Sequence, residues 1–118
     1  RGAETQRAVA TYLVEHGFPH ATDAGAGRGG VDILGVVGLA WEVKARREYS
    51  PLAWVRQAAK CAGLPIVTAR PDGLGPAHVA DWPTTMRLAD LVHLLRAAGY
   101  GQPPNVVDCE IIIQGESE

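Results

Sequence analysis

The sequence has 118 residues, of which 47% are apolar, and this length and composition fit one compact domain with a single core. The sequence has only two cysteines, so we expect no disulfide framework. It shows no charged-then-apolar leader and no run of about 18 apolar residues, so we expect neither secretion nor a membrane helix. We therefore expect a soluble, cytoplasmic protein. The formal net charge of −2, taken alone, argues against a nucleic-acid ligand, because phosphate binding depends on Lys and Arg.

The first half of the chain predicts a helix, a glycine-rich loop and a hairpin. Apolar residues recur at helical spacing over 3–16, and a glycine follows where that helix would end. After a short extended piece, residues 25–30 contain four glycines, so this loop lets the backbone approach a ligand closely. Residues 31–37 and 39–45 are rich in β-branched side chains and are joined through Gly38, which indicates the two strands of a tight hairpin.

The second half predicts further helices and strands around a turn. A helix over 51–62 is the best bounded, because Ser50 can cap it and Pro51 suits its first position. The other predicted elements are a buried strand over 64–69, a turn at Pro71-Asp72-Gly73, a helix over 84–98 and an edge strand over 109–114. This order predicts an α/β fold with a mixed sheet flanked by helices, in one domain over 1–100 followed by a tail over 101–118.

Charge is distributed unevenly along the chain. Residues 28–70 contain seven basic and three acidic side chains, a net charge of +4, whereas residues 71–118 contain two basic and seven acidic ones, a net charge of −5. The first 27 residues contribute −1. A positive central stretch is compatible with a polyanionic ligand, so the overall charge does not exclude nucleic acid.

The predicted hairpin carries an unusual set of charges. Alternation along the second strand places Glu42 and Lys44 on one face and apolar side chains on the other, while Asp32 interrupts the apolar first strand. If Gly38 ends a three-residue hairpin loop, Asp32 stands opposite Glu42 with Lys44 on the diagonal. Two facing carboxylates repel each other unless a cation lies between them. Mg²⁺ meets that need, since it is held by one or two carboxylates, waters and substrate phosphate.

Asp32 followed by Glu42-Val43-Lys44 across a hairpin resembles the PD-(D/E)XK nuclease superfamily, although Val31 stands where the family name has proline. Glu4 on the opening helix resembles the acidic residue that many members place there, and Gln57 resembles the glutamine of their next helix. The glycine-rich run ahead of Asp32 is similar to that of small archaeal-type Holliday junction resolvases and their phage-encoded relatives. The resemblance covers roughly residues 2–70 and implies a restriction-endonuclease-like αβββαβ core, here followed by a C-terminal helix.

This resemblance implies Mg²⁺-dependent hydrolysis of phosphodiesters, with Mn²⁺ as a possible substitute. Asp32, Glu42 and the Val43 carbonyl would be the metal ligands, and Lys44 would position or activate the attacking water. Glu4 would reach the metal directly or through a water, and Gln57 would act beside it. The implied DNA contacts are Gly27, Arg28, Gly29, Arg46, Arg47, Arg56 and Lys60.

We therefore expect a structure-selective DNA endonuclease, similar to a Holliday junction resolvase, that acts as a homodimer on four-way junctions in the cytoplasm of a bacterial host. Two alternatives stay open: a nuclease of the same fold that cuts linear, flapped or damaged DNA, and a catalytically silent DNA-binding or protein-interaction module. Simpler interpretations also exist for single residues. Asp32 and Lys44 could form a plain cross-strand ion pair. Glu4 could complement the dipole of the first helix, and Gln57 could be an ordinary surface residue of its helix.

Overall fold

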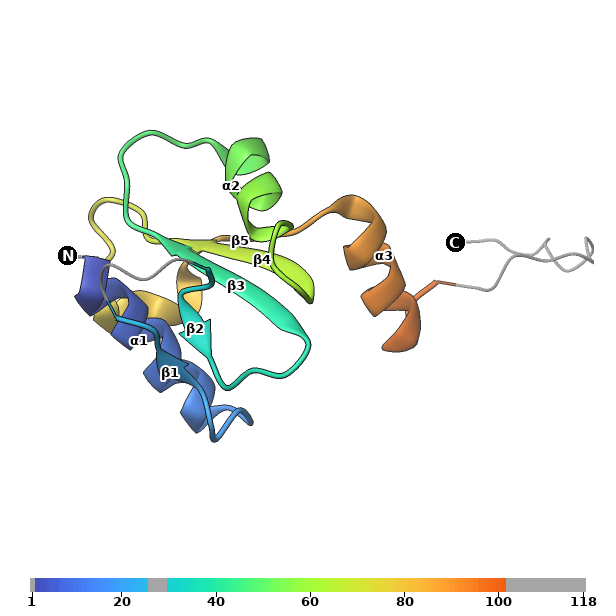
Figure 1. Cartoon of the computed structure of the whole chain (residues 1–118), viewed down its shortest axis with the longest axis horizontal. Coiled ribbons are helices and arrows are strands. Elements are labelled where there is room, and N and C mark those ends of the chain that lie inside the picture. Colours follow the sequence, from blue (N-terminus) through green and yellow to red (C-terminus); the bar gives the residue numbers. More distant parts are fainter. Residues whose placement is uncertain (1, 26–29, 102–118) are drawn as a thin grey trace, which may run out of the picture. The chain divides into compact units, whose positions relative to one another are not determined.

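A computed structural model describes residues 2–25 and 30–101 of the chain (Figure 1). Its elements are α1 (Gly2–Glu15), β1 (Thr22–Asp23), β2 (Ile33–Leu34), β3 (Leu39–Lys44), α2 (Pro51–Ala58), β4 (Leu64–Ala69), the 3₁₀ helix η1 (Pro76–Asp81), β5 (Thr84–Thr85) and α3 (Leu88–Ala97). Internal contacts divide the chain into two units, Arg1–Arg87 and Leu88–Glu118, whereas the sequence analysis places the domain end at residue 100. The first unit confirms the predicted α/β fold with a mixed sheet flanked by helices.

The main sheet has the strand order β3-β4-β5. β3 and β4 run parallel, from Leu39 opposite Leu64 to Lys44 opposite Ala69, so both strands end at the same edge of the sheet. α2 makes the crossover between them, as parallel neighbours require. β5 pairs antiparallel with β4, which makes the sheet mixed. β3 is therefore an edge strand, and one of its sides is free for other groups.

The two helices of the first unit cover opposite faces of this sheet (Figure 1). α1 buries Val9 and Leu13 in a cluster that includes Val43 of β3. α2 buries Trp54 against Val67 of β4 in a second cluster. Burial of apolar surface on both faces explains why β4 is a nearly continuous apolar run rather than an alternating one.

The hairpin differs from its prediction. β2 pairs antiparallel with β1 in a separate two-stranded sheet and forms no regular ladder with β3. The amide of Leu39 donates to the carbonyl of Val36 at 3.1 Å. The turn is therefore closed by Val36 and Leu39, whereas the prediction paired Gly35 with Leu39. The reason lies in Gly35, whose φ is +79° and whose backbone lies directly against that of His20. This left-handed residue breaks the strand, so the predicted register is wrong.

The helix boundaries and the turn are partly as predicted. The turn at 71–73 is confirmed by a hydrogen bond from the Leu74 amide to the Pro71 carbonyl, 3.3 Å. The helix expected over 51–62 ends at Ala58, and the helix expected over 84–98 begins only at Leu88. In the second case Thr84 and Thr85 extend the sheet instead. The strand expected over 109–114 lies outside the described residues.

The second unit contributes one described helix, α3, none of whose residues is buried. Its exposed apolar side chains are Leu88, Leu91, Val92, Leu94 and Leu95. Across the described part of the chain, no helix combines the length and the apolar character needed to cross a bilayer.

Replacing Gly35 by alanine should destabilise the fold more than replacing Gly38 by alanine. Both glycines have a positive φ, +79° and +82°, so either alanine costs about 1–2 kcal/mol in backbone strain. Only at Gly35 would the new Cβ also collide with a backbone carbonyl, that of His20. Urea unfolding should therefore give the lower midpoint for Gly35→Ala, and equal midpoints would contradict the close approach to His20.

Candidate active site

A polar pocket of about 370 Å³ lies along the last residues of β3, between the start of α1 and the end of α2. Six residues singled out in the sequence line it, namely Asp32, Glu42, Val43, Lys44, Arg46 and Gln57. The remaining lining residues are Gly2, Gln6, Gly30 and Ala45. The fold thus gathers side chains from both helices and from two extended segments at one end of the edge strand β3.

The backbone and the carboxylate of Asp32 form hydrogen bonds with backbone groups on the free edge of β3. The amide of Asp32 donates to the Trp41 carbonyl at 3.0 Å, and the Val43 amide donates to Asp32 Oδ2 at 2.8 Å. These two backbone groups flank Glu42, so the pair of hydrogen bonds fixes Asp32 beside that residue. The two carboxylates therefore lie close together, as the sequence predicts, although the turn and register that bring them there differ from the predicted ones.

Glu42 is only 3% exposed, and this burial dominates its electrostatics. Desolvation and, to a smaller extent, the neighbouring Asp32 charge raise the pKa of Glu42, Lys44 opposes both effects, and the resulting pKa is about 7. The distance from Lys44 Nζ to Glu42 Oε1 is 3.7 Å. One lysine therefore offsets only part of the cost of placing two carboxylates in a buried site.

Lys44 is held in place by α2. Its side chain is 9% exposed, and its Nζ donates to Gln57 Oε1 at 2.8 Å. The hydrogen bond joins β3 to the helix that packs on the same face, so Gln57 orients the ammonium group toward the carboxylates. Because the side chain of Lys44 is buried and anchored, its charge is located at a fixed point in the pocket.

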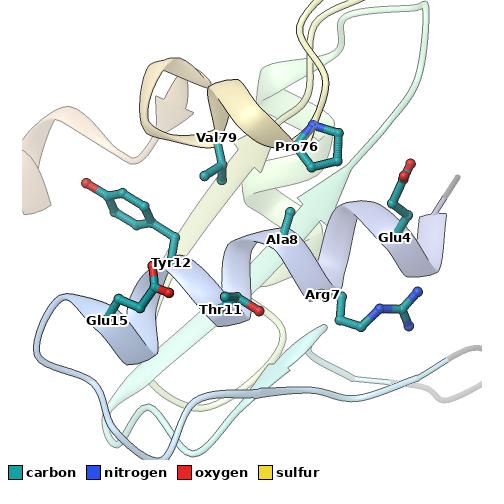
Figure 2. Close-up of a pocket in the computed structure, with 8 residues that line it drawn as sticks. All are labelled: Glu4, Arg7, Ala8, Thr11, Tyr12, Glu15, Pro76 and Val79. Carbon is teal, nitrogen blue, oxygen red and sulfur yellow. The ribbon is translucent and has the colours of Figure 1, made fainter.

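Glu4 does not line this pocket. Its side chain is 57% exposed and its Oε1 accepts a hydrogen bond from Arg70 Nη1 at 2.9 Å, which lowers the pKa of Glu4. It lines a different pocket between α1 and η1, along with Ala8, Tyr12 and Val79 (Figure 2). The structure therefore gives no support to the predicted contact of Glu4 with a metal held by Asp32 and Glu42.

Gln6 stands where Glu4 was expected. Its Nε2 donates to Asp32 Oδ1 at 3.1 Å, and its Oε1 is buried without a hydrogen-bond partner among the described residues. Gln6 lies three and seven residues before the buried Val9 and Leu13, which puts it on the core-facing side of α1. The same helical periodicity, extended backward from the apolar stripe, would have identified Gln6 from the sequence.

The residues proposed to bind DNA fall into three groups. Arg46 lines the pocket, and Arg47 joins it in lining a neighbouring one. Arg56 at the end of α2 and Lys60 just beyond it are exposed. Three further candidates lie outside the described residues: Gly27, Arg28 and Gly29.

The donor atoms of the pocket fit a hard divalent cation. Within the described part of the chain, no cluster of three or more His, Cys, Asp or Glu side chains could hold a metal. The pocket instead offers two adjacent carboxylates and the unpartnered amide oxygen of Gln6. All are oxygen donors, which suit Mg²⁺ or Mn²⁺ with the remaining positions taken by water and substrate. A cation would relieve both the repulsion between Asp32 and Glu42 and the unmet acceptor on Gln6.

Comparison of the chain with protein-family models, with curated proteins and with solved structures gives no match. The resemblance to the PD-(D/E)XK nucleases therefore rests on the sequence motif of this chain alone.

Replacing Glu42 by glutamine should stabilise the metal-free protein at high pH. A pKa of about 7 in the folded state, against an ordinary value near 4.3 in the unfolded chain, means that the folded protein binds the proton more tightly. Wild-type stability therefore falls as pH rises through this interval and then levels off. Glutamine carries no charge at any pH, so the variant avoids this loss.

Thermal or urea unfolding in a metal chelator at pH 5 and pH 8 would measure this effect. The variant should gain roughly 1–3 kcal/mol relative to wild type between the two pH values. Asp23→Asn provides a control for the loss of one carboxylate outside the pocket. A gain that does not depend on pH would contradict the raised pKa of Glu42.

Proposed function

We propose that this protein is a metal-dependent nuclease that hydrolyses DNA phosphodiesters in the pocket beside β3. One observation carries the proposal: Asp32 and the buried Glu42 lie close together, with an anchored lysine beside them. A buried pair of like charges is costly unless a cation or a proton offsets it. A pocket that maintains this cost and opens to solvent is typical of a catalytic site rather than of a structural ion pair.

The chain's own groups have distinct roles in this proposal. Asp32 and Glu42 hold the cation, with the Val43 carbonyl and the Gln6 amide oxygen as further donors. A divalent cation in such a site polarises the phosphate and lowers the pKa of a bound water. Lys44 donates a hydrogen bond to the phosphate or to the attacking water, and so stabilises negative charge as it develops.

Gln57 is a positioning residue in this scheme, since it touches Lys44 rather than the substrate. It fixes the ammonium group through the 2.8 Å hydrogen bond to Lys44 Nζ.

Hydrolysis breaks the phosphorus–oxygen bond to the leaving strand end and adds the water oxygen to phosphorus. An ammonium group placed within hydrogen-bond reach before substrate arrives does not have to be ordered during that step.

DNA is the proposed substrate because of charge and resemblance together. Residues 28–70, which include most of the pocket-lining residues, carry a net charge of +4, and the exposed Arg46, Arg47, Arg56 and Lys60 can contact phosphates. The glycine-rich run before Asp32 favours a restriction-endonuclease-like core related to Holliday junction resolvases. We therefore propose a four-way junction as the first substrate to test. A junction with twofold symmetry would be cut by a homodimer with two such sites.

The Lys44→Met variant should lose Mg²⁺-dependent DNA cleavage. Methionine retains the buried stem of the side chain but removes the donor that would stabilise charge on the phosphate, so we expect a fall of about 10²–10³-fold in rate. Cleavage would be measured on a four-way junction, a flap, a linear duplex and a single strand. Arg7→Ala, an exposed cation lost from α1, is the control and should cut at the wild-type rate.

The pattern of products separates the candidate functions. Paired symmetric nicks on the junction support the resolvase-like reading, while cutting of flaps or linear DNA supports another nuclease of the same fold. If the protein bound DNA but cleaved none of the substrates, the result would support a DNA-binding module and contradict the proposal that the protein is an enzyme. Cleavage that survives Lys44→Met would contradict the site assigned here.

A further inference from the structure

A second pocket lies next to the proposed active site and has a different character. Its volume is about 290 Å³, and its lining includes three arginines, Arg46, Arg47 and Arg70, with the aromatic residues Tyr49 and Trp54. Arg46 lines both pockets. The two pockets therefore adjoin at the end of β3, where a nucleic-acid strand that placed a phosphate in one would pass the other.

Arg70 is a fixed cation at this end of the sheet. Its backbone amide donates to the Lys44 carbonyl at 2.8 Å, and its Nη1 donates to Glu4 at 2.9 Å and to Thr5 at 3.1 Å. Its guanidinium also lies 5.8 Å from the ring centroid of Trp82. Its Nε is buried with no hydrogen-bond partner among the described residues. Glu4 thus holds the guanidinium of Arg70, a residue that lines the second pocket.

Tyr49 offers an aromatic surface whose orientation is set by a buried neighbour. Tyr49 is 61% exposed, whereas Trp54 is 7% exposed. Their rings meet edge to face, with centroids 5.5 Å apart and planes at 89°, a favourable arrangement for aromatic pairs. The ring of Tyr49 is therefore held in place while much of its surface stays open to a ligand.

We propose that this second pocket holds one unstacked nucleotide adjacent to the phosphate that is cut, an inference that rests on the proposed nuclease function. Arg46 and Arg47 bind its phosphate, since guanidinium groups match phosphate geometry, and the Tyr49 ring stacks on its base. Asp72 also lines the pocket and Glu4 neutralises Arg70, so Arg46 and Arg47 leave the site with a net charge of +1. The volume, near the lower limit of roughly 300 Å³ for small-ligand sites, suits a single nucleotide and not a duplex.

Such a subsite would favour DNA that already has an unpaired or poorly stacked nucleotide. Extruding a base from an intact duplex costs a few kcal/mol, and the cost is smallest where pairing is already lost. Junction centres, flaps and single strands supply such nucleotides. The second pocket would therefore select for the structure of DNA without reading its sequence, because every base has a face that can stack.

Binding of short DNA strands containing one 2-aminopurine, in a chelator so that no cleavage occurs, tests this proposal. Stacking on Tyr49 should quench the 2-aminopurine fluorescence when the strand is single, and much less when the base is paired in a duplex. Tyr49→Ala should lose the quenching and about tenfold in affinity for the single strand, while Tyr49→Phe should keep both. Arg47→Ala should weaken binding, and Arg7→Ala, away from both pockets, should not.

Equal quenching and affinity in the wild type and Tyr49→Ala would overturn the nucleotide subsite, even if the protein cleaves DNA. A loss of affinity in Arg47→Ala without any effect of Tyr49→Ala would also overturn it, because the pocket would then bind phosphate alone. The measurement does not involve cleavage, so a protein that stacks the base but cuts no DNA would support this subsite while the nuclease proposal fails.

Discussion

The burial of Glu42 beside Asp32 is the interaction on which the rest of the candidate site depends. Glu42 is 3% exposed and its pKa is raised to about 7, so the folded chain carries an electrostatic cost at this point. The surrounding groups offset part of that electrostatic cost. The Val43 amide binds Asp32, Lys44 lies near Glu42, and Gln57 holds Lys44. The part of the cost that they leave uncompensated is the basis of our proposal that the pocket binds a cation.

The topology explains how these groups meet. Because β3 runs parallel to β4, the connection between the two strands has to cross over the sheet, and α2 makes that crossover. Gln57 is thereby brought over Lys44. Because β3 is an edge strand, its free backbone groups are available to Asp32. α1 covers the opposite face and adds Gln6 from its first turns. An edge strand flanked by two helices is therefore sufficient to assemble the pocket from segments that lie far apart in the sequence.

The sequence was most informative where local patterning determines the structure. Alternation along β3 placed Glu42 and Lys44 on one face and Val43 on the other, and the contacts with Gln57 and with the α1 cluster agree with that division. Register depended instead on tertiary contact. The close approach of Gly35 to His20 sets the turn, and no pattern within the hairpin indicates it. Composition likewise does not reveal that Thr84 and Thr85 extend the sheet before α3 begins.

The position of Glu4 also depends on tertiary contact. A carboxylate near the start of the first helix suits a metal site by residue type, but the helical phase turns Glu4 toward Arg70 and directs Gln6 to Asp32. Residue type alone favoured Glu4, whereas the phase of the apolar stripe identifies Gln6 as the residue of α1 that contacts Asp32. Arg70, the partner of Glu4, comes from the end of β4, which no local pattern connects to α1.

Direct measurement of Mn²⁺ binding by calorimetry tests the central claim that Asp32 and Glu42 share a divalent cation. The wild type should bind Mn²⁺, with Mg²⁺ competing for the same site, and Asp32→Asn should lose that binding while retaining its circular dichroism spectrum. Asp23→Asn, which removes a carboxylate from outside the pocket, should bind as the wild type does. Absence of Mn²⁺ binding in the wild type, or binding that Asp32→Asn leaves unchanged, would contradict the account.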